Sequence, residues 1–217
     1  MICFITIFST SEADLNGIFK QEYNKKTVEL FVSGSSRQYI NGSKQITKPE
    51  YAIAPWNKRY DWCSKCGANY DDHPFIGFSI KSKKIRFNSY FIRCGCCYEG
   101  CCCEEADYCF DCCLYSWSLQ ISNDNQTWTE VHKMKDKEMR ICKEKTYNLE
   151  KSYEAKYVRL IQNEACPGDP PCIAINRMEL FGEVIDDNAI DDNFISYHDD
   201  DEDDVSIIGH ISKNARV

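Results

Sequence analysis

The chain has 217 residues, 15 of them cysteine, with 43% hydrophobic and 13% aromatic residues. This composition predicts a globular domain with a hydrophobic core and gives no support for general disorder. No apolar run approaches the roughly 20 residues that a membrane-spanning helix needs, so we expect no transmembrane segment. The first eight residues are apolar but lack the basic region of a signal peptide.

The net charge of −8 belongs to the C-terminal end of the chain. Residues 186–217 hold ten acidic and two basic residues, so the remainder of the chain is electrically neutral. Such a block of like charge predicts a disordered, solvated acidic tail. An alternative is that this tail folds onto the basic residues of the Lys81–Arg86 segment, or onto the Lys133–Lys145 segment, and screens that surface from acidic ligands. No basic stripe with interleaved aromatic residues is present, so nucleic acid is not an expected partner.

We expect residues 1–30 to form an N-terminal segment that includes a short helix over residues 12–24. Leu15, Ile18 and Phe19 would share one face of that helix, and Ser11 is a candidate cap. Residues 31–185 would then form the main domain.

The clearest strand pattern lies at residues 115–130. Trp117, Leu119 and Ile121 alternate with polar residues, which predicts a strand with one buried face. The polar residues 122–126 predict a tight turn, and Trp128 would begin the strand that folds back. We expect Trp117 and Trp128 to lie in the core.

This hairpin resembles the core hairpin of discoidin domains, also called coagulation factor V/VIII type C domains. Further motifs of that family are matched in order at residues 73–80, 89–93, 156–162 and 179–182. Phe75 stands where relatives have Trp, and Ser79 where they have Asp. The resemblance covers roughly residues 31–185. It implies an all-β fold, an antiparallel jelly-roll β-sandwich of the galactose-binding-like type.

The resemblance also implies a binding module without catalytic activity. Discoidin-like domains bind sugars, lipid headgroups or protein partners through loops at one end of the sandwich. The matching aromatic and basic residues here are Trp56, Arg59, Tyr60 and Trp62, with Tyr98 in a later loop. Such residues suit stacking on a sugar or gripping a peptide. The alternative for Trp56 and Trp62 is that each fills the core.

Nine cysteines gather within residues 94–113, which the resemblance identifies as an insertion in a ligand-facing loop. Two C-x-x-C pairs predict a four-cysteine zinc site, with copper(I) as an alternative ion, and a third cluster predicts a second site. The expected ligands are Cys63, Cys66, Cys109 and Cys112, and then Cys94, Cys96 and Cys97. Reduced thiols without metal are the second expectation and disulfide bonds the third. Cys166 and Cys172 could close a small loop in either chemistry.

No arrangement of residues predicts an active site. The four histidines lack metal-ligand spacing, and Asp71 and Asp72 fit a turn better than a catalytic carboxylate pair. We therefore expect a module, not an enzyme, that recognises carbohydrate or a protein partner. It would need no cofactor; calcium at a discoidin-type loop cannot be placed on particular residues. The alternatives are a metal-binding protein and an intracellular adaptor. Without a signal peptide, a cytoplasmic location is expected ahead of secretion.

Overall fold

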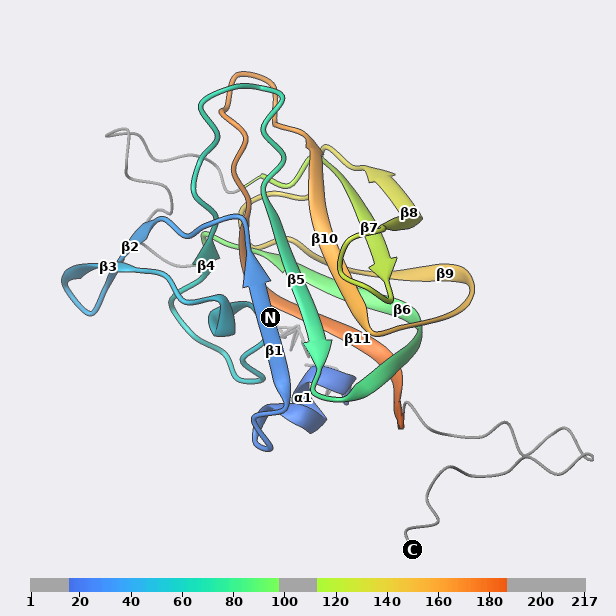
Figure 1. The fold of residues 1–217 in the computed structure, drawn as a ribbon. Coiled ribbons are helices and arrows are strands. Elements are labelled where there is room, and N and C mark those ends of the chain that lie inside the picture. The colour runs from blue at the N-terminus through green and yellow to red at the C-terminus, as the bar shows by residue number, and fades with distance from the viewer. Residues whose placement is uncertain (1–15, 98–112, 187–217) are drawn as a thin grey trace, which may run out of the picture. The chain divides into compact units, whose positions relative to one another are not determined.

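The structure is a computed structural model that describes residues 16–97 and 113–186 (Figure 1). In chain order its elements are α1 (Ile18–Tyr23), β1 (Val28–Val32), β2 (Arg37–Ile40), β3 (Ser43–Ile46), the 3-10 helix η1 (Pro49–Ala52), β4 (Trp62–Cys63), β5 (Phe75–Ile80), β6 (Lys83–Cys94), β7 (Ser116–Ser122), β8 (Thr129–Lys135), β9 (Glu144–Ala155), β10 (Tyr157–Glu164) and β11 (Ala174–Asp186). Among these elements no helix is long and apolar enough to cross a membrane.

Two antiparallel sheets form the sandwich. One has the strand order β1-β5-β10-β7-β8 and the other β4-β11-β6-β9, while β2 and β3 form a separate hairpin. The chain crosses between the sheets repeatedly, because β5, β7 and β10 belong to the first sheet and β6, β9 and β11 to the second. This alternation is that of a jelly roll, and it confirms the predicted fold class.

The core lies between the sheets and follows the two-residue period of the strands. In β10, Val158 and Leu160 point inward, and Arg159 between them points to the other face. Trp117 belongs to the same core and is fully buried, as expected. The predicted hairpin is confirmed: β7 and β8 pair on either side of a turn.

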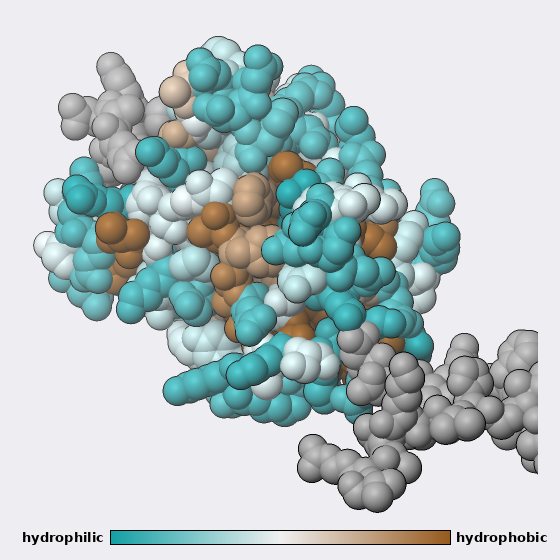
Figure 2. All heavy atoms as spheres, in the orientation of Figure 1, coloured by the Kyte–Doolittle hydropathy of each residue, from teal (hydrophilic) through white to brown (hydrophobic). Residues whose placement is uncertain are grey.

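The other face of the five-stranded sheet carries an aromatic cluster. The ring of Phe31 lies 6.2 Å from those of Trp128 and Tyr157 and 6.3 Å from that of Phe75, measured between centroids. The Arg159 guanidinium stacks 4.1 Å above the Trp128 ring. Trp128 is half-buried on this face and does not lie in the core, so the predicted core position is wrong. Its ring instead packs against the Arg159 cation, which remains near solvent. Figure 2 shows hydrophobic side chains in the middle of this face, surrounded by polar ones.

Helix α1 packs against the core of the sandwich. Ile18 and Phe19 belong to the main core, and β1 already begins at Val28. The helix is shorter than expected, since α1 begins at Ile18 after Gly17. Residues 12–15, most of the cysteine-rich insertion and residues 187–217 lie outside the described residues.

Candidate functional site

Three connections meet at the end of β1 that is remote from α1 (Figure 1). They are residues 33–36, 64–74 and 165–173, from the β1–β2, β4–β5 and β10–β11 connections. The backbone N–H of Lys65 donates to the Gly34 carbonyl at 3.2 Å, and that of Gly67 to the Pro171 carbonyl at 2.8 Å. A disulfide between Cys66 and Cys172 also joins two of the three connections. These bonds hold the loops together as one wall.

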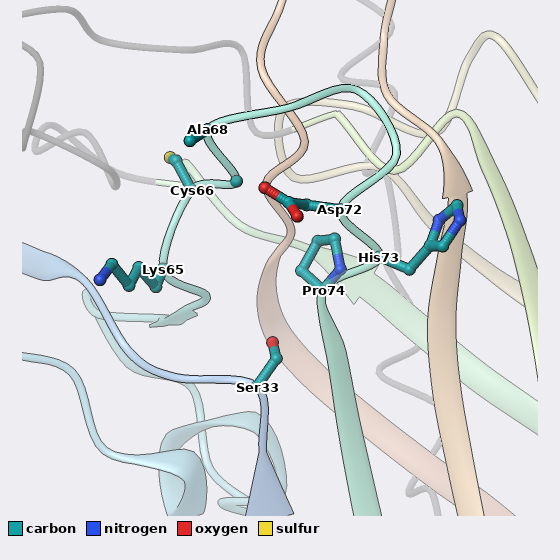
Figure 3. A pocket seen from close by; sticks show the side chains of 8 residues that line it. Ser33, Lys65, Cys66, Ala68, Asp72, His73 and Pro74 are labelled. Atoms are coloured by element: carbon teal, nitrogen blue, oxygen red, sulfur yellow. The ribbon is translucent and has the colours of Figure 1, made fainter.

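A pocket of about 390 Å³ opens between these loops, and we call it the loop pocket. Its lining residues are Ser33, Lys65, Cys66, Gly67, Ala68, Asp72, His73 and Pro74. In Figure 3 the side chains of Ser33, Asp72 and Pro74 face the same space. Lys65 extends to one side of that space, and the His73 ring lies on the other.

Asp72 shapes the pocket wall and also offers charge to it. Its Oδ2 accepts a hydrogen bond from the Asn69 N–H at 3.0 Å, and its own N–H donates to the Asn69 carbonyl at 3.0 Å. Gly67 packs so closely that a Cβ there would lie 2.5 Å from the Asp72 Cβ. Asp72 is therefore the turn residue that the sequence predicted, and its carboxylate also lines the cavity.

His73 presents a ring nitrogen whose role is fixed by its neighbour. Nδ1 lies 2.9 Å from the Gln162 carbonyl oxygen, which can only accept a hydrogen bond. Nδ1 therefore carries the proton, and Nε2 of the neutral ring is an acceptor. Ser33 anchors the opposite wall, because its Oγ accepts a hydrogen bond from the Phe75 N–H at 3.0 Å.

The pocket residues had no motif that sequence reasoning could detect. They come from positions 33, 65–68 and 72–74, and only the antiparallel pairing of β1 with β5 brings Ser33 next to Pro74. A weak indication of the pocket in the sequence is the polar run Asp71-Asp72-His73-Pro74 at the start of a predicted strand.

Several of the predicted metal ligands form disulfides in this structure. Cys66 pairs with Cys172 and Cys97 with Cys142, and Cys63 and Cys96 are also disulfide-bonded. A disulfide sulfur has no thiolate to offer a zinc ion, so the structure differs from the expectation for these four residues. Cys94 keeps a free, buried thiol, and burial raises its pKa to about 12.

The two remaining ligands of the predicted four-cysteine zinc site, Cys109 and Cys112, lie outside the described residues. The described residues contain no group of three or more metal-ligating side chains. Cys166 and Cys172 do not close a loop with each other, because Cys166 pairs instead with Cys113, the last cysteine of the insertion. Zinc binding by a reduced form of the chain stays a prediction.

The predicted ligand-binding tryptophans have opposite environments. Trp62 is 0% exposed in β4, and its indole N–H donates to Ser35 Oγ at 3.0 Å. The prediction that Trp62 contacts ligand is therefore wrong for this structure, and its alternative, a core position, holds. Trp56 is 47% exposed, and its ring meets that of Tyr23 edge-on at 5.1 Å.

The other predicted residues of this segment do not reach the loop pocket. Arg59 is exposed, and the half-buried Tyr60 ring packs against that of Tyr51, with centroids 4.3 Å apart. None of Trp56, Arg59 and Tyr60 lines the loop pocket. Tyr98 lies outside the described residues.

Two charged side chains that the sequence did not single out hold this segment in place. Lys58 is buried and donates to the Asn176 carbonyl, and burial lowers its pKa to about 8. Asp61 is also buried, and its carboxylate accepts hydrogen bonds from Gln38 Nε2, Asn176 Nδ2 and the Cys96 N–H at 2.8–3.1 Å. With Lys58, Asp61 and Trp62 facing inward, Trp56 is left on the surface.

The sequence matches no family model and no curated protein. Among solved structures, the chain is similar to the module CpGH89CBM32-5 of Clostridium perfringens, solved in complex with GalNAc-β-1,3-galactose. The two are 14% identical over 72% of this chain and 96% of that one, with a TM-score of 0.49. It is also similar to chitosan-binding module 1 of a Paenibacillus chitosanase/glucanase, with 18% identity, 72% and 96% coverage and a TM-score of 0.47. Likenesses of this size say nothing about what this chain binds.

Proposed function

We propose that this chain is a recognition module without catalytic activity, and that it binds carbohydrate in the loop pocket. One observation carries the proposal. The residues that line the pocket or flank it include an aspartate, a histidine, a lysine and a serine, and hydrogen bonds and a disulfide hold their loops together. Each hydroxyl of a sugar can donate and accept, so a mixed set of acceptors and donors matches it.

An exposed aromatic ring stands on the same loop. Tyr70 is 73% exposed and lies two residues before Asp72. A tyrosine in this position offers a flat apolar face against which the C–H face of a sugar ring can pack. Few side chains need to be ordered on binding, because the disulfide and the backbone hydrogen bonds already fix the loop.

A glycan array probed with the full chain tests the ligand class, and calorimetry then measures affinity for the best glycan. We expect Tyr70→Ala and His73→Ala each to weaken binding about tenfold or more, since each removes a stacking surface or a hydrogen-bond partner. Tyr39→Ala is the matched control, because Tyr39 is 51% exposed on the separate β2–β3 hairpin.

Unchanged melting temperatures in all three variants would show that the fold is intact. Absence of any glycan response, or equal affinities for Tyr70→Ala and Tyr39→Ala, would contradict the proposal. Capture of a protein partner without a glycan response would favour the adaptor alternative.

A further inference from the structure

A second cavity, separate from the loop pocket, lies beside the other end of β1. It has a volume of about 330 Å³ and is lined by Tyr23, Lys26, Val28, Leu30, Glu50 and Ile53. We call it the α1–η1 pocket, because Tyr23 ends helix α1 and Glu50 belongs to η1. It shares no lining residue with the loop pocket.

The wall of this pocket is aromatic and its floor is aliphatic. The Tyr23 ring is flanked by the indole of Trp56, whose plane stands at 89° to it. Val28, Leu30 and Ile53 supply methyl groups beneath. Tyr23 is the aromatic residue among those that line the cavity, and the face of an aromatic ring attracts an alkylammonium group.

The charges near the Tyr23 ring also favour a bound cation. Burial raises the pKa of both Tyr23 and Tyr51, and the nearby Tyr60 hydroxyl and Glu50 carboxylate raise both pKa values further. Of these four residues, Tyr23 and Glu50 line the cavity. A carboxylate beside a phenol ring stabilises a cation and disfavours further negative charge.

Two opposite charges face this cavity without neutralising each other. Glu50 and Lys26 both line it, yet within residues 16–97 and 113–186 neither side chain takes part in a hydrogen bond or an ion pair. Lys26 is held at the rim by its backbone, which has a φ of +55° in the turn between α1 and β1. One anion, one cation and an apolar floor are complementary to a ligand that carries both charges on a short aliphatic body.

We infer that the α1–η1 pocket binds a small organic zwitterion. Its alkylammonium group lies against Tyr23 and Glu50, and its anionic group meets Lys26. The aliphatic atoms between the two charges cover Val28, Leu30 and Ile53. This site is independent of the carbohydrate proposal, since it uses different residues.

Calorimetry on the full chain with phosphocholine as the probe tests the inference. Choline and inorganic phosphate, each carrying one of the two charges, are measured in parallel. We expect phosphocholine to bind at least about tenfold more tightly than either half. Glu50→Gln and Lys26→Gln should each weaken phosphocholine binding by about tenfold. Trp56→Ala removes the ring that packs against Tyr23 and orients it, so it should weaken the binding of both phosphocholine and choline.

Glu138→Gln and Lys137→Gln are the matched controls, because both residues are exposed and remote in sequence from the pocket. Glu50 and Lys26 are exposed as well, so their variants should fold, and unchanged melting temperatures will show this. No phosphocholine binding at millimolar concentration would overturn the inference. So would binding that Glu50→Gln leaves unchanged, or equal affinity for choline and phosphocholine. None of these results depends on whether glycans bind the loop pocket.

Discussion

A single buried carboxylate joins helix α1 to strand β11. The Glu179 side chain accepts hydrogen bonds from the N–H groups of Phe19 at 2.7 Å, Lys20 at 3.0 Å and Leu180 at 3.0 Å. Gly17 leaves room for it, since a Cβ there would lie 2.0 Å from the Glu179 Cγ. Burial nevertheless raises the pKa of Glu179 to about 7, against the opposing effect of these hydrogen bonds.

This pKa makes the stability of the protein depend on pH. Between the ordinary value of 4.5 and about 7, the folded chain binds more protons at Glu179 than the unfolded chain, so the free energy of unfolding falls as pH rises. We expect the stability difference between wild type and Glu179→Gln to shrink by roughly 3 kcal/mol from pH 4.5 to 8. Urea denaturation at both pH values measures it, and a constant difference would contradict the prediction.

Gly77 makes room for the aromatic cluster on the outer sheet face. A Cβ at this position would lie 2.1 Å from the Phe31 ring, which packs directly across from it. Gly77→Ala should destabilise the protein by about 1–3 kcal/mol because the ring must move. In a Phe31→Ala background the same change should cost far less, as a double-mutant cycle of unfolding free energies would show. Equal costs in both backgrounds would rule out this steric cause.

At the scale of elements, the β7–β8 turn is held by one aspartate. The Asp124 Oδ1 accepts hydrogen bonds from the Gln126 N–H at 2.8 Å, the Thr127 N–H at 2.7 Å and the Ser122 hydroxyl at 2.9 Å. These bonds lower the pKa of Asp124 well below its usual range. The turn thus fixes the register in which β7 and β8 pair.

Asp124→Ala should lower the melting temperature at pH 7, because two backbone N–H groups and one hydroxyl lose their acceptor. Asp124→Asn keeps one side-chain oxygen and should lose less. A group with a lowered pKa stabilises the fold above its unfolded pKa and loses that effect as pH falls. The difference in melting temperature between wild type and Asp124→Ala should therefore become smaller toward pH 3. A difference that widens there would contradict this assignment.

The strands could be predicted from sequence because their pattern is local. The alternation of Trp117, Leu119 and Ile121 with polar residues required no knowledge of the partner strand. Trp56 and Trp62 could not be separated in this way. Their positions depend on Lys58 and Asp61, which bind Asn176 more than 110 residues later in the chain. The loop pocket likewise depends on pairing between distant strands.

At the scale of the molecule, disulfides tie the loops to the sandwich. Cys113–Cys166 and Cys97–Cys142 attach both described ends of the cysteine-rich insertion to other connections. The sequence predicted a cytoplasmic location, whereas disulfides form and persist mainly in oxidising compartments. A count of free thiols in protein from its natural source decides between these locations.

The thiols also give a direct prediction. In native, unreduced protein, Cys94 should resist alkylation because it is buried and its pKa is raised to about 12. It should react after denaturation. The six cysteines of the three disulfides should react only after reduction; they are Cys66, Cys97, Cys113, Cys142, Cys166 and Cys172. Peptide mass spectrometry reads out both steps. Bound zinc together with alkylation of these six cysteines before reduction would support the metal-binding alternative instead.

Strand β1 has a cavity near each of its ends. Leu30 lines the α1–η1 pocket, and Ser33, the residue directly after β1, lines the loop pocket. Because successive side chains of a strand point to opposite faces of the sheet, the odd separation of three residues places these two side chains on opposite faces. Leu30 packs against the core, whereas its neighbour Phe31 belongs to the aromatic cluster on the outer face. The strand therefore separates the two proposed sites, and we expect a ligand in one cavity to leave the affinity of the other unchanged.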